Sequence, residues 1–246
     1  MPWAYALSIK KRWTMPDVFS IALKGDELNE RFGGGIPKNS VIVIEGENGL
    51  GKSVLAQRLM YGVMQHGATA TYLSTELNTG SFLNQMRSFN YGVKEKLLNQ
   101  ELLFLSIYPT FGNVAFEKNF LNKILMTRQL FEHDLIVFDT LSSMLIENEI
   151  TQNNAFDILK FLKELTALNK IIIFCVNPKQ VSPYFFDLLK TVADIYFRLE
   201  AREQYGSWIK LIHIERFTGA AGDLSTPIPY KVLAGLGLAL EIASTS

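Results

Sequence analysis

The sequence has little of several residue types, and each shortage excludes a class of protein. A single cysteine, Cys175, excludes an intrachain disulfide and fits a reducing compartment, where it is expected as a buried apolar residue. The three histidines are isolated and lack metal-ligand spacing. No segment approaches the ~18–20 apolar residues of a membrane span, and the N-terminal charges follow a short apolar stretch, the reverse of a secretory signal. We therefore expect a cytoplasmic protein without a transmembrane segment.

The chain also lacks an excess of either charge. Twenty-four basic residues balance 24 acidic ones, whereas non-specific nucleic-acid binding draws its affinity from a basic excess. No nucleic-acid partner is therefore expected. A neutral protein gains little solubility from self-repulsion, so association with copies of itself or with partners is expected. The ordinary composition, 48% hydrophobic and 20% charged over 246 residues, excludes disorder and coiled coils.

Strand-like and helix-like patterns alternate along the chain. Apolar, β-branched runs occur at 41–45, 70–74, 102–107, 135–139 and 171–176, and helical patterns at 53–66, 79–89, 115–131 and 154–169. This alternation predicts an α/β fold, with a mostly parallel sheet and helices on both faces. Later runs at 193–201 and 207–217, and a hairpin at 230–242, predict an antiparallel C-terminal extension.

The domain organisation follows from what interrupts these patterns. Residues 1–40 read as irregular or weakly structured, and neither a repeat nor a low-complexity linker divides the rest. We therefore expect one domain over residues 1–246, with residues 1–21 as an N-terminal extension.

A phosphate-binding motif directly follows the first strand. Residues 46–53 read GENGLGKS, which matches G-x-x-x-x-G-K-[ST]. Glycines let the backbone approach a phosphate, and successive amides with the following helix dipole bind the anion. Lys52 would reach the β- and γ-phosphates, and the Ser53 hydroxyl would ligate Mg²⁺. We expect the nucleotide-binding residues to be Gly46, Asn48, Gly49, Leu50, Gly51, Lys52, Ser53 and Val54.

The second element of the expected site is the strand 135–139, an apolar run that ends in Asp139. A carboxylate at the carboxyl edge of the sheet beside a phosphate loop can hold the hydration shell of Mg²⁺, so Ser53 and Asp139 are the expected metal residues. The alternative is a helix-capping or turn aspartate. Thr140, Ser142 and Ser143 follow at once and would either cap the next segment or report on the γ-phosphate.

A carboxylate that orients the attacking water is harder to place. Thr140 occupies the position directly after Asp139, where some phosphate-loop ATPases carry a glutamate. Glu76, at the end of the neighbouring strand, is the catalytic candidate, and its alternative is a solvated acid at a helix start. Asn177 closes the strand 171–176 and is interpreted as a turn residue in preference to a phosphate sensor.

Longer stretches resemble the RecA/KaiC branch of P-loop ATPases. Residues 33–37 (GGGIP), just before the first strand, are similar to the segment that leads into KaiC-like domains. Within that branch the chain resembles the FlaH (ArlH) family of archaellum ATP-binding proteins. This likeness spans about residues 22–243 and is carried by 74–86 (STELNTGSFLNQM), 216–222 (RFTGAAG) and 235–242 (GLGLALEI).

The resemblance implies a RecA-like domain that binds ATP with Mg²⁺ and assembles into a homo-oligomeric ring, expected to be a hexamer. In the family this ring contacts the hexameric motor ATPase FlaI and docks beneath the membrane platform protein FlaJ. It thereby implies a cytoplasmic protein held at the membrane through the archaellum motor complex. Such proteins act through nucleotide occupancy more than through rapid turnover.

The chain departs from active relatives at two places. KaiC-like hydrolases commonly have two adjacent acids at the strand end, but Leu77 follows Glu76 here. Active relatives also place a lysine two residues before an arginine that reaches the neighbouring subunit's γ-phosphate. Arg216, the candidate for that trans contact, is present, but Ile214 takes the lysine position. Both departures predict slow or absent hydrolysis.

The same motifs are compatible with two other functions. An active KaiC-like ATPase or signalling enzyme would use Glu76 as its base. A RecA-type recombinase would need a basic or aromatic loop for DNA, whereas residues 141–154 (LSSMLIENEITQNN) are neutral to acidic. The recombinase is therefore disfavoured.

Overall fold

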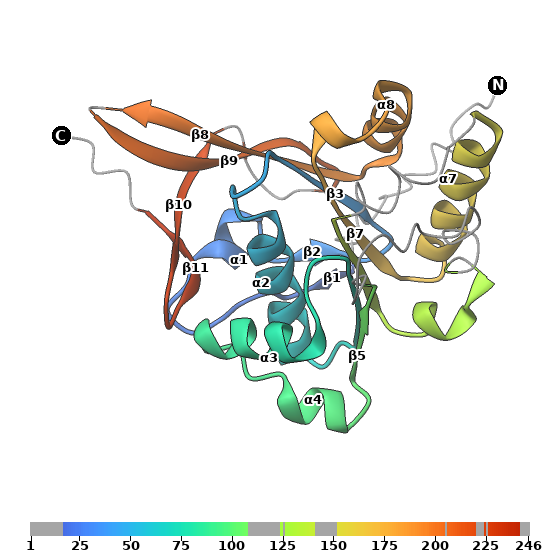
Figure 1. The fold of residues 1–246 in the computed structure, drawn as a ribbon, viewed down its shortest axis with the longest axis horizontal. Helices are drawn as coiled ribbons and strands as arrows, with labels where there is room; N and C mark the ends of the chain where they lie inside the picture. The colour runs from blue at the N-terminus through green and yellow to red at the C-terminus, as the bar shows by residue number, and fades with distance from the viewer. Residues whose placement is uncertain are drawn as a thin grey trace, which may run out of the picture.

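A nine-stranded sheet runs through the molecule, with helices on both faces (Figure 1). The computed structural model describes residues 17–107, 124, 126–140, 152–204, 206–219, 224 and 226–241, with the backbone alone for 152–155 and 157. Most of the expected helix 115–131, the residues Ser142 and Ser143, and segment 141–151 lie outside this part of the chain. The strand order is β11-β10-β9-β8-β3-β7-β6-β4-β5.

The five early strands are parallel to one another, as expected. They are β3 (Val41–Glu45), β4 (Ala70–Ser74), β5 (Leu102–Ser106), β6 (Leu135–Asp139) and β7 (Ile171–Val176). The residues of β3, β4, β6 and β7 are almost all buried because both faces of the sheet are covered there, whereas β5, at the edge of the sheet, is mostly half-buried. The parallel register brings the carboxyl ends of β3, β4 and β6 to the same edge of the sheet.

Two apolar cores occupy the two faces of this sheet. The first contains Ile42 and Ile44 and packs under α2 (Lys52–Gln65) and α3 (Thr79–Ser88), with α4 (Lys94–Leu98) at its rim. The second contains Val41 and Val43 and packs under α7 (Gln152–Thr166) and α8 (Pro183–Val192). Successive residues of one strand enter opposite cores because side chains alternate across a pleated sheet. Figure 1 shows the two helix layers on opposite sides.

The C-terminal strands extend the sheet in the antiparallel sense, which confirms the expectation. β8 (Ile195–Gln204) runs parallel to β3 and antiparallel to β9 (Ser207–Phe217). β10 (Ile228–Leu233) and β11 (Gly237–Leu240) form the expected hairpin. Figure 1 shows the β8–β9 ribbon reaching past the main body, with the β10–β11 hairpin lying beside α2.

Several short elements were not predicted. The region before residue 40, expected to be irregular, holds β1 (Val18–Phe19), α1 (Leu28–Arg31) and β2 (Ile36–Pro37). Helix α8 was missed although its start signal is readable: Ser182 caps it by accepting a hydrogen bond from the Phe185 amide, and Pro183 follows. The end of the expected helix 115–131 forms a 3₁₀ turn, η1 (Arg128–Phe131).

In the residues that the structure describes, no helix is both long and apolar enough to cross a membrane.

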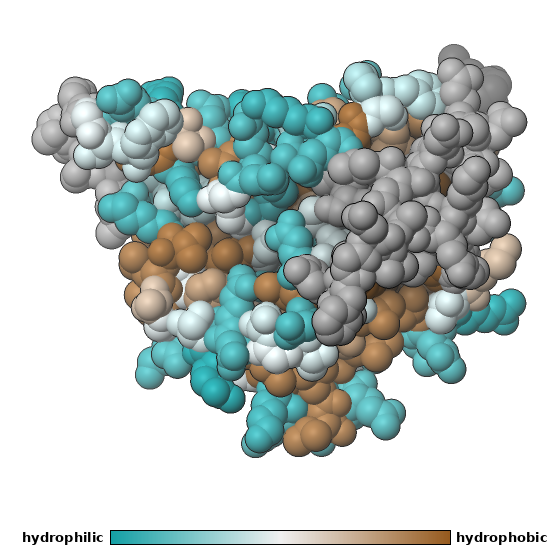
Figure 2. Space-filling view, viewed as in Figure 1, coloured by the Kyte–Doolittle hydropathy of each residue, from teal (hydrophilic) through white to brown (hydrophobic). Residues whose placement is uncertain are grey.

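Some apolar side chains are exposed at the surface. Three of them, Val232, Leu233 and Leu236, lie together on the β10–β11 hairpin, where Figure 2 shows an apolar area.

Replacing Phe82 with alanine tests the core under α3. Phe82 is fully buried, and its ring lies 4.2 Å from that of Phe104 and 5.2 Å from that of Tyr72. We expect a loss of about 3–5 kcal/mol in the free energy of unfolding, measured by urea denaturation. Alanine at Phe156, which is exposed on α7, is the control and should cost under about 0.5 kcal/mol. Equal losses for the two variants would contradict this account of the core.

Candidate functional site

The loop at residues 46–51 connects β3 to α2 at the carboxyl edge of the sheet. Gly49 and Gly51 have φ angles of 81° and 95°, which side-chain-bearing residues rarely adopt. Gly51 is also the N-cap of α2, so the amides of the first helical turn face the loop. Amides and helix dipole together form a cradle that suits an anionic phosphate.

Lys52, the first residue of α2, is 8% exposed and lies against this loop. Its ammonium nitrogen Nζ donates a hydrogen bond to the backbone oxygen of Glu47 at 3.0 Å. Burial lowers the pKa of Lys52, while the nearby Glu76 and Asp139 carboxyl groups oppose that shift. The Lys52 ammonium group therefore lies against the loop, where a phosphate would bind.

Ser53 and Asp139 meet below the loop, as the sequence predicted. The Ser53 hydroxyl donates to Oδ1 of Asp139 at 2.7 Å, and the Tyr72 hydroxyl donates to Oδ2 at 2.7 Å. The Cys175 thiol also hydrogen-bonds this carboxyl group. Burial raises the pKa of Asp139, and the hydrogen bonds from Ser53 and Tyr72 oppose the shift. Asp139 is thus a buried acid held by several donors.

Hard oxygen ligands are what Mg²⁺ prefers, and the Ser53 hydroxyl and Asp139 carboxylate supply them. Among the described residues there is no group of three or more histidine, cysteine, aspartate or glutamate side chains that could hold a metal alone. The arrangement instead fits a cation held partly by substrate phosphates and water. Ser53 and Asp139 would hold it, and it would neutralise charge on the phosphates.

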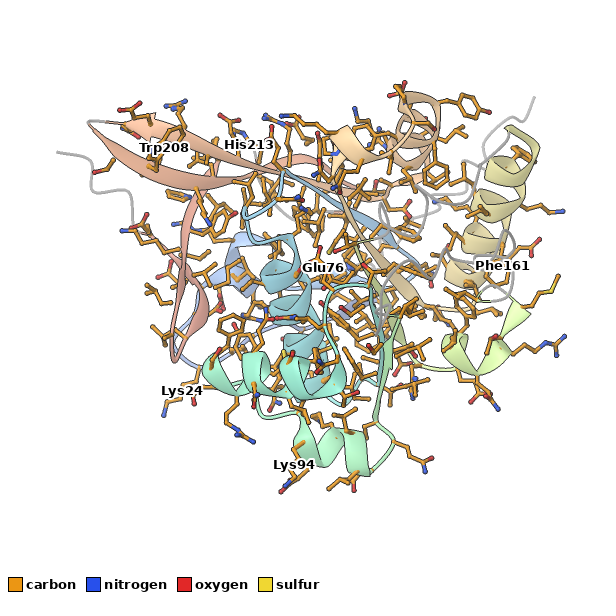
Figure 3. All side chains as sticks on the ribbon, in the orientation of Figure 1. Lys24, Glu76, Lys94, Phe161, Trp208 and His213 are labelled. Atoms are coloured by element: carbon orange, nitrogen blue, oxygen red, sulfur yellow. The ribbon has the colours of Figure 1, made fainter. Side chains whose placement is uncertain are left out.

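Glu76 lies at the end of β4, one strand away from Asp139. Its Oε1 accepts a hydrogen bond from the Thr140 hydroxyl at 2.9 Å. Thr140 has a φ of 65°, an uncommon conformation for a β-branched residue. Figure 3 places Glu76 in the middle of the molecule beside α2, whereas Trp208 lies far out on the β8–β9 ribbon. The structure therefore brings Glu76 to the same edge as the loop.

Asn177 caps a turn, and its side chain also contacts the phosphate loop. Its Oδ1 accepts from the amide of Lys179 at 3.1 Å, which caps the turn η2 (Pro178–Gln180). Its Nδ2 donates to Oδ1 of Asn48 in the phosphate loop at 3.0 Å. The turn interpretation is confirmed, and the same side chain also contacts the loop.

Other loop contacts come from residues that sequence reasoning missed. The Lys210 ammonium, on β9, donates to the Gly49 backbone oxygen at 2.7 Å, and the Tyr230 hydroxyl, on β10, donates to that of Leu50. Tyr72 and its bond to Asp139 were missed as well. No motif marks these residues, because Lys210 and Tyr230 reach the loop from strands distant in sequence and Tyr72 reaches Asp139 from a neighbouring strand of the sheet.

Arg216 does not lie at the phosphate loop of its own chain. It pairs with Tyr196 near the start of β8, at the sheet edge opposite the phosphate loop. Its Nη1 donates to the backbone oxygens of Lys190 and Ala193, at 2.7 and 2.8 Å, at the end of α8. A contact with the nucleotide of a neighbouring subunit stays a prediction.

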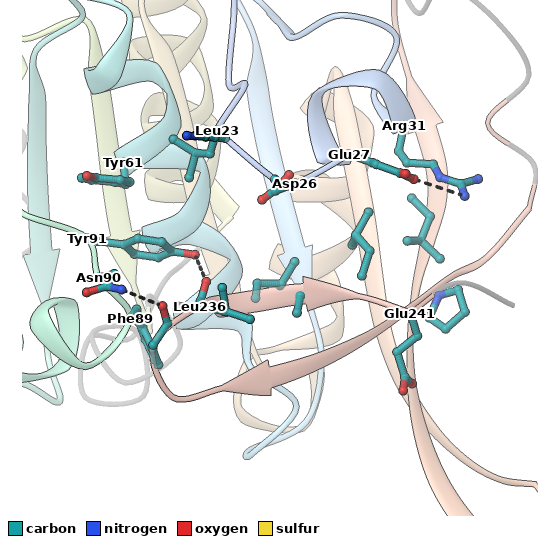
Figure 4. A pocket seen from close by; sticks show the side chains of 18 of the residues that line it. Leu23, Asp26, Glu27, Arg31, Tyr61, Phe89, Asn90, Tyr91, Leu236 and Glu241 are labelled. Carbon is teal, nitrogen blue, oxygen red and sulfur yellow. Dashed lines mark hydrogen bonds and ion pairs between the residues drawn. The ribbon is translucent and has the colours of Figure 1, made fainter.

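A cavity of about 720 Å³ lies away from the phosphate loop, between α1, the C-terminal half of α2 and the β10–β11 hairpin (Figure 4). Tyr61 and Tyr91 stack in its wall with ring centres 4.7 Å apart. The Tyr91 hydroxyl donates to the Leu236 oxygen at 3.1 Å, and Asn90 donates to the Gly235 oxygen at 3.0 Å. These bonds fasten the hairpin tip to the segment after α3.

Known proteins resemble this chain in sequence and in fold. Residues 25–225 match the family described as "ATPase: KaiC". The chain is 41% identical, over 92% of its length and 97% of the other chain, to archaeal flagellar ATP-binding protein FlaH of Methanocaldococcus jannaschii. It is 38% identical to the FlaH protein of Methanococcus voltae, over 92% of this chain and 98% of the other.

A solved structure agrees with these sequence matches. The crystal structure of flagellar accessory protein FlaH from Methanocaldococcus jannaschii superimposes with a TM-score of 0.86 at 38% identity. The match covers 92% of this chain and all of that one. The chain therefore belongs to the KaiC-like ATPase family and, within it, to the FlaH family.

Proposed function

We propose that this protein is an ATP-binding regulatory and assembly component of the archaellum motor. The observation that carries the proposal is the Ser53–Asp139 hydrogen bond, at 2.7 Å beneath the phosphate loop, in a chain of the FlaH family. It joins the two residues expected to hold Mg²⁺, next to a lysine and a helix N-terminus suited to phosphates. ATP with Mg²⁺ is the nucleotide complex that this arrangement fits.

Slow hydrolysis is part of the proposal. Leu77 follows Glu76, so a second adjacent acid is missing. The Thr140 hydroxyl donates to the Glu76 carboxylate and so engages an oxygen that a general base needs for water. Arg216 is bound to carbonyls at the end of α8. Each feature weakens a part of the machinery that phosphoryl transfer requires.

The proposed role is a nucleotide-dependent switch. ATP would order a homo-oligomeric ring, expected to be hexameric, and the ring would present a surface to the motor ATPase FlaI and dock at the membrane platform FlaJ. The protein would then be cytoplasmic and held at the membrane through the motor complex. A ligand shifts assembly only if it binds the assembled and free states with different affinity.

Measuring the molar mass in solution tests the switch. We expect light scattering to show a shift towards the ring when Mg·ATP is added, and no shift for Lys52→Ala. FlaI should bind the ring more tightly than the nucleotide-free protein. Equal assembly with and without nucleotide would contradict the switch.

An active ATPase or signalling enzyme is the second candidate. The observation in its favour is that Ser74 and Asp139 are register partners, which sets Glu76 at the phosphate-loop edge. Sustained phosphate release that is lost in Glu76→Gln would support this candidate over the slow switch.

A further inference from the structure

A chain of hydrogen bonds, buried except at its outer end, leads from α3 to the carboxylate of Asp139. Nε2 of Gln85, on α3, donates to Oε1 of Gln57, on α2, at 3.1 Å. Nε2 of Gln57 donates to the Tyr72 hydroxyl, on β4, at 3.3 Å. That hydroxyl in turn donates to Oδ2 of Asp139, on β6, at 2.7 Å. Four elements are therefore joined, and three of the side chains that join them, Gln85, Gln57 and Tyr72, lie outside the nucleotide-binding motifs.

The direction of these bonds follows from the chemistry of the groups. An ionised carboxylate only accepts hydrogen bonds, so the Tyr72 hydroxyl must donate its one hydrogen to Asp139. The oxygen of Tyr72 then accepts from the Gln57 amide nitrogen, which turns the Gln57 oxygen towards Gln85. Every donor in the chain thus points towards Asp139, and bonds aligned in this way polarise and strengthen one another.

Burial makes the chain costly to break. Gln57 and Tyr72 are fully buried and Asp139 is 1% exposed. A buried polar group without a hydrogen-bond partner is strongly unfavourable, so each member depends on the next. Together with the Ser53 hydroxyl, which holds Oδ1, the chain therefore fixes the orientation of the Asp139 carboxylate.

Core packing alone does not account for Tyr72. Its ring lies 5.2 Å from that of Phe82 and 6.0 Å from that of Phe104, in an aromatic cluster that a phenylalanine would fill equally well. The hydroxyl adds nothing to this packing. Its contacts are with Gln57 and Asp139.

We propose that Tyr72 is a positioning residue for the divalent cation of the nucleotide site. Its hydroxyl holds Oδ2 of Asp139, which leaves Oδ1 turned towards Ser53, and Gln57 and Gln85 hold the hydroxyl. This inference rests on the proposed function and adds to it a residue that acts through Asp139. Partners behind a metal ligand typically change metal affinity by about 10–100-fold when they are removed.

The test is ATP binding by calorimetry across a series of Mg²⁺ concentrations, including a sample with chelator. We expect Tyr72→Phe to raise the half-saturating Mg²⁺ concentration about tenfold, while ATP affinity in chelator stays within about twofold of the unchanged protein. Gln85 is the half-buried end of the chain. Gln85→Ala should raise the half-saturating Mg²⁺ concentration less, by about threefold, because only the hydrogen bond farthest from Asp139 is lost.

Tyr61→Phe is the matched control. Its ring stacks on Tyr91 in the wall of the cavity, so the same loss of a hydroxyl should leave the Mg²⁺ requirement unchanged. Thermal melting verifies that each variant is folded, and Gln85→Ala decides the matter if Tyr72→Phe does not fold.

The possible outcomes separate the two proposals. An unchanged Mg²⁺ requirement in folded Tyr72→Phe, or in Gln85→Ala if only that variant folds, would overturn the positioning role. An equal loss of ATP affinity with and without Mg²⁺ would also overturn it, because the hydroxyl would then support the whole site. If the unchanged protein bound no ATP, its own titration would show this, and the proposed function would fail together with this inference.

Discussion

Replacing Lys52 with alanine is expected to abolish the stabilisation of this protein by Mg·ATP. A ligand at a hundred times its dissociation constant stabilises the folded state by about 2.7 kcal/mol, which for a chain of this size raises the melting temperature by about 5–10 °C. Lys52 is the cation of the phosphate cradle. Without it the triphosphate loses its main charge partner, and the shift should vanish.

The measurement compares thermal melting with and without Mg·ATP, beside steady-state phosphate release. Lys179→Ala is the matched control, because that lysine also touches the loop, through Glu47 at 2.7 Å, but its side chain is 71% exposed. The control should keep the full melting shift. Phosphate release no faster than in Lys52→Ala supports a switch, while sustained release above that background supports an active enzyme. A melting shift in Lys52→Ala equal to that of the unchanged protein would contradict the site.

Asp139→Asn is expected to have two opposite effects. Burial raises the pKa of Asp139 in the folded protein, so at neutral pH the folded state bears the cost of a buried charge. Asparagine removes that charge and should raise the melting temperature of the nucleotide-free protein. It also removes the acidic ligand next to Ser53, so the Mg²⁺ concentration needed for ATP binding should rise about tenfold or more.

The stabilising effect depends on pH in a defined direction. The unfolded chain releases the proton near the ordinary value of 3.8, and the folded protein releases it at a higher pH. Stability therefore falls as pH rises between these two pKa values, and the cost is complete above both. The gain from Asp139→Asn should accordingly disappear in acid. Asp187→Asn, an exposed carboxylate on α8, is the control with no expected gain at any pH. A gain that grew in acid would contradict a buried charge at Asp139.

Much of the fold was predictable because local pattern and tertiary position agree in its core. The five parallel strands lie where apolar, β-branched runs predicted them, since a strand covered on both faces is apolar at every position. The short elements before residue 40 and helix α8 were missed. The early elements have only two to four residues each, too few for a periodic pattern. Helix α8 has a recognisable start signal, the Ser182 cap followed by Pro183.

Within the site, the sequence predicted the residues whose chemistry is tied to a motif. Lys52, Ser53 and Asp139 meet where expected, because a phosphate loop and an acid at a strand end share one edge of a parallel sheet. Glu76 arrives at the same edge through the register of β4 and β6. Its catalytic role and the trans contact of Arg216 stay predictions.

The sequence by itself determined the α/β fold, the phosphate loop and its acidic partner, because each of these is recorded in contiguous residues of characteristic spacing. Only the tertiary structure decided that Tyr72, Gln57 and Gln85 lead to Asp139, and that Thr140 is bound to Glu76. These contacts join side chains from different strands and helices. Their partners are chosen by the register of the sheet and the packing of helices on it, which spacing along the chain does not record.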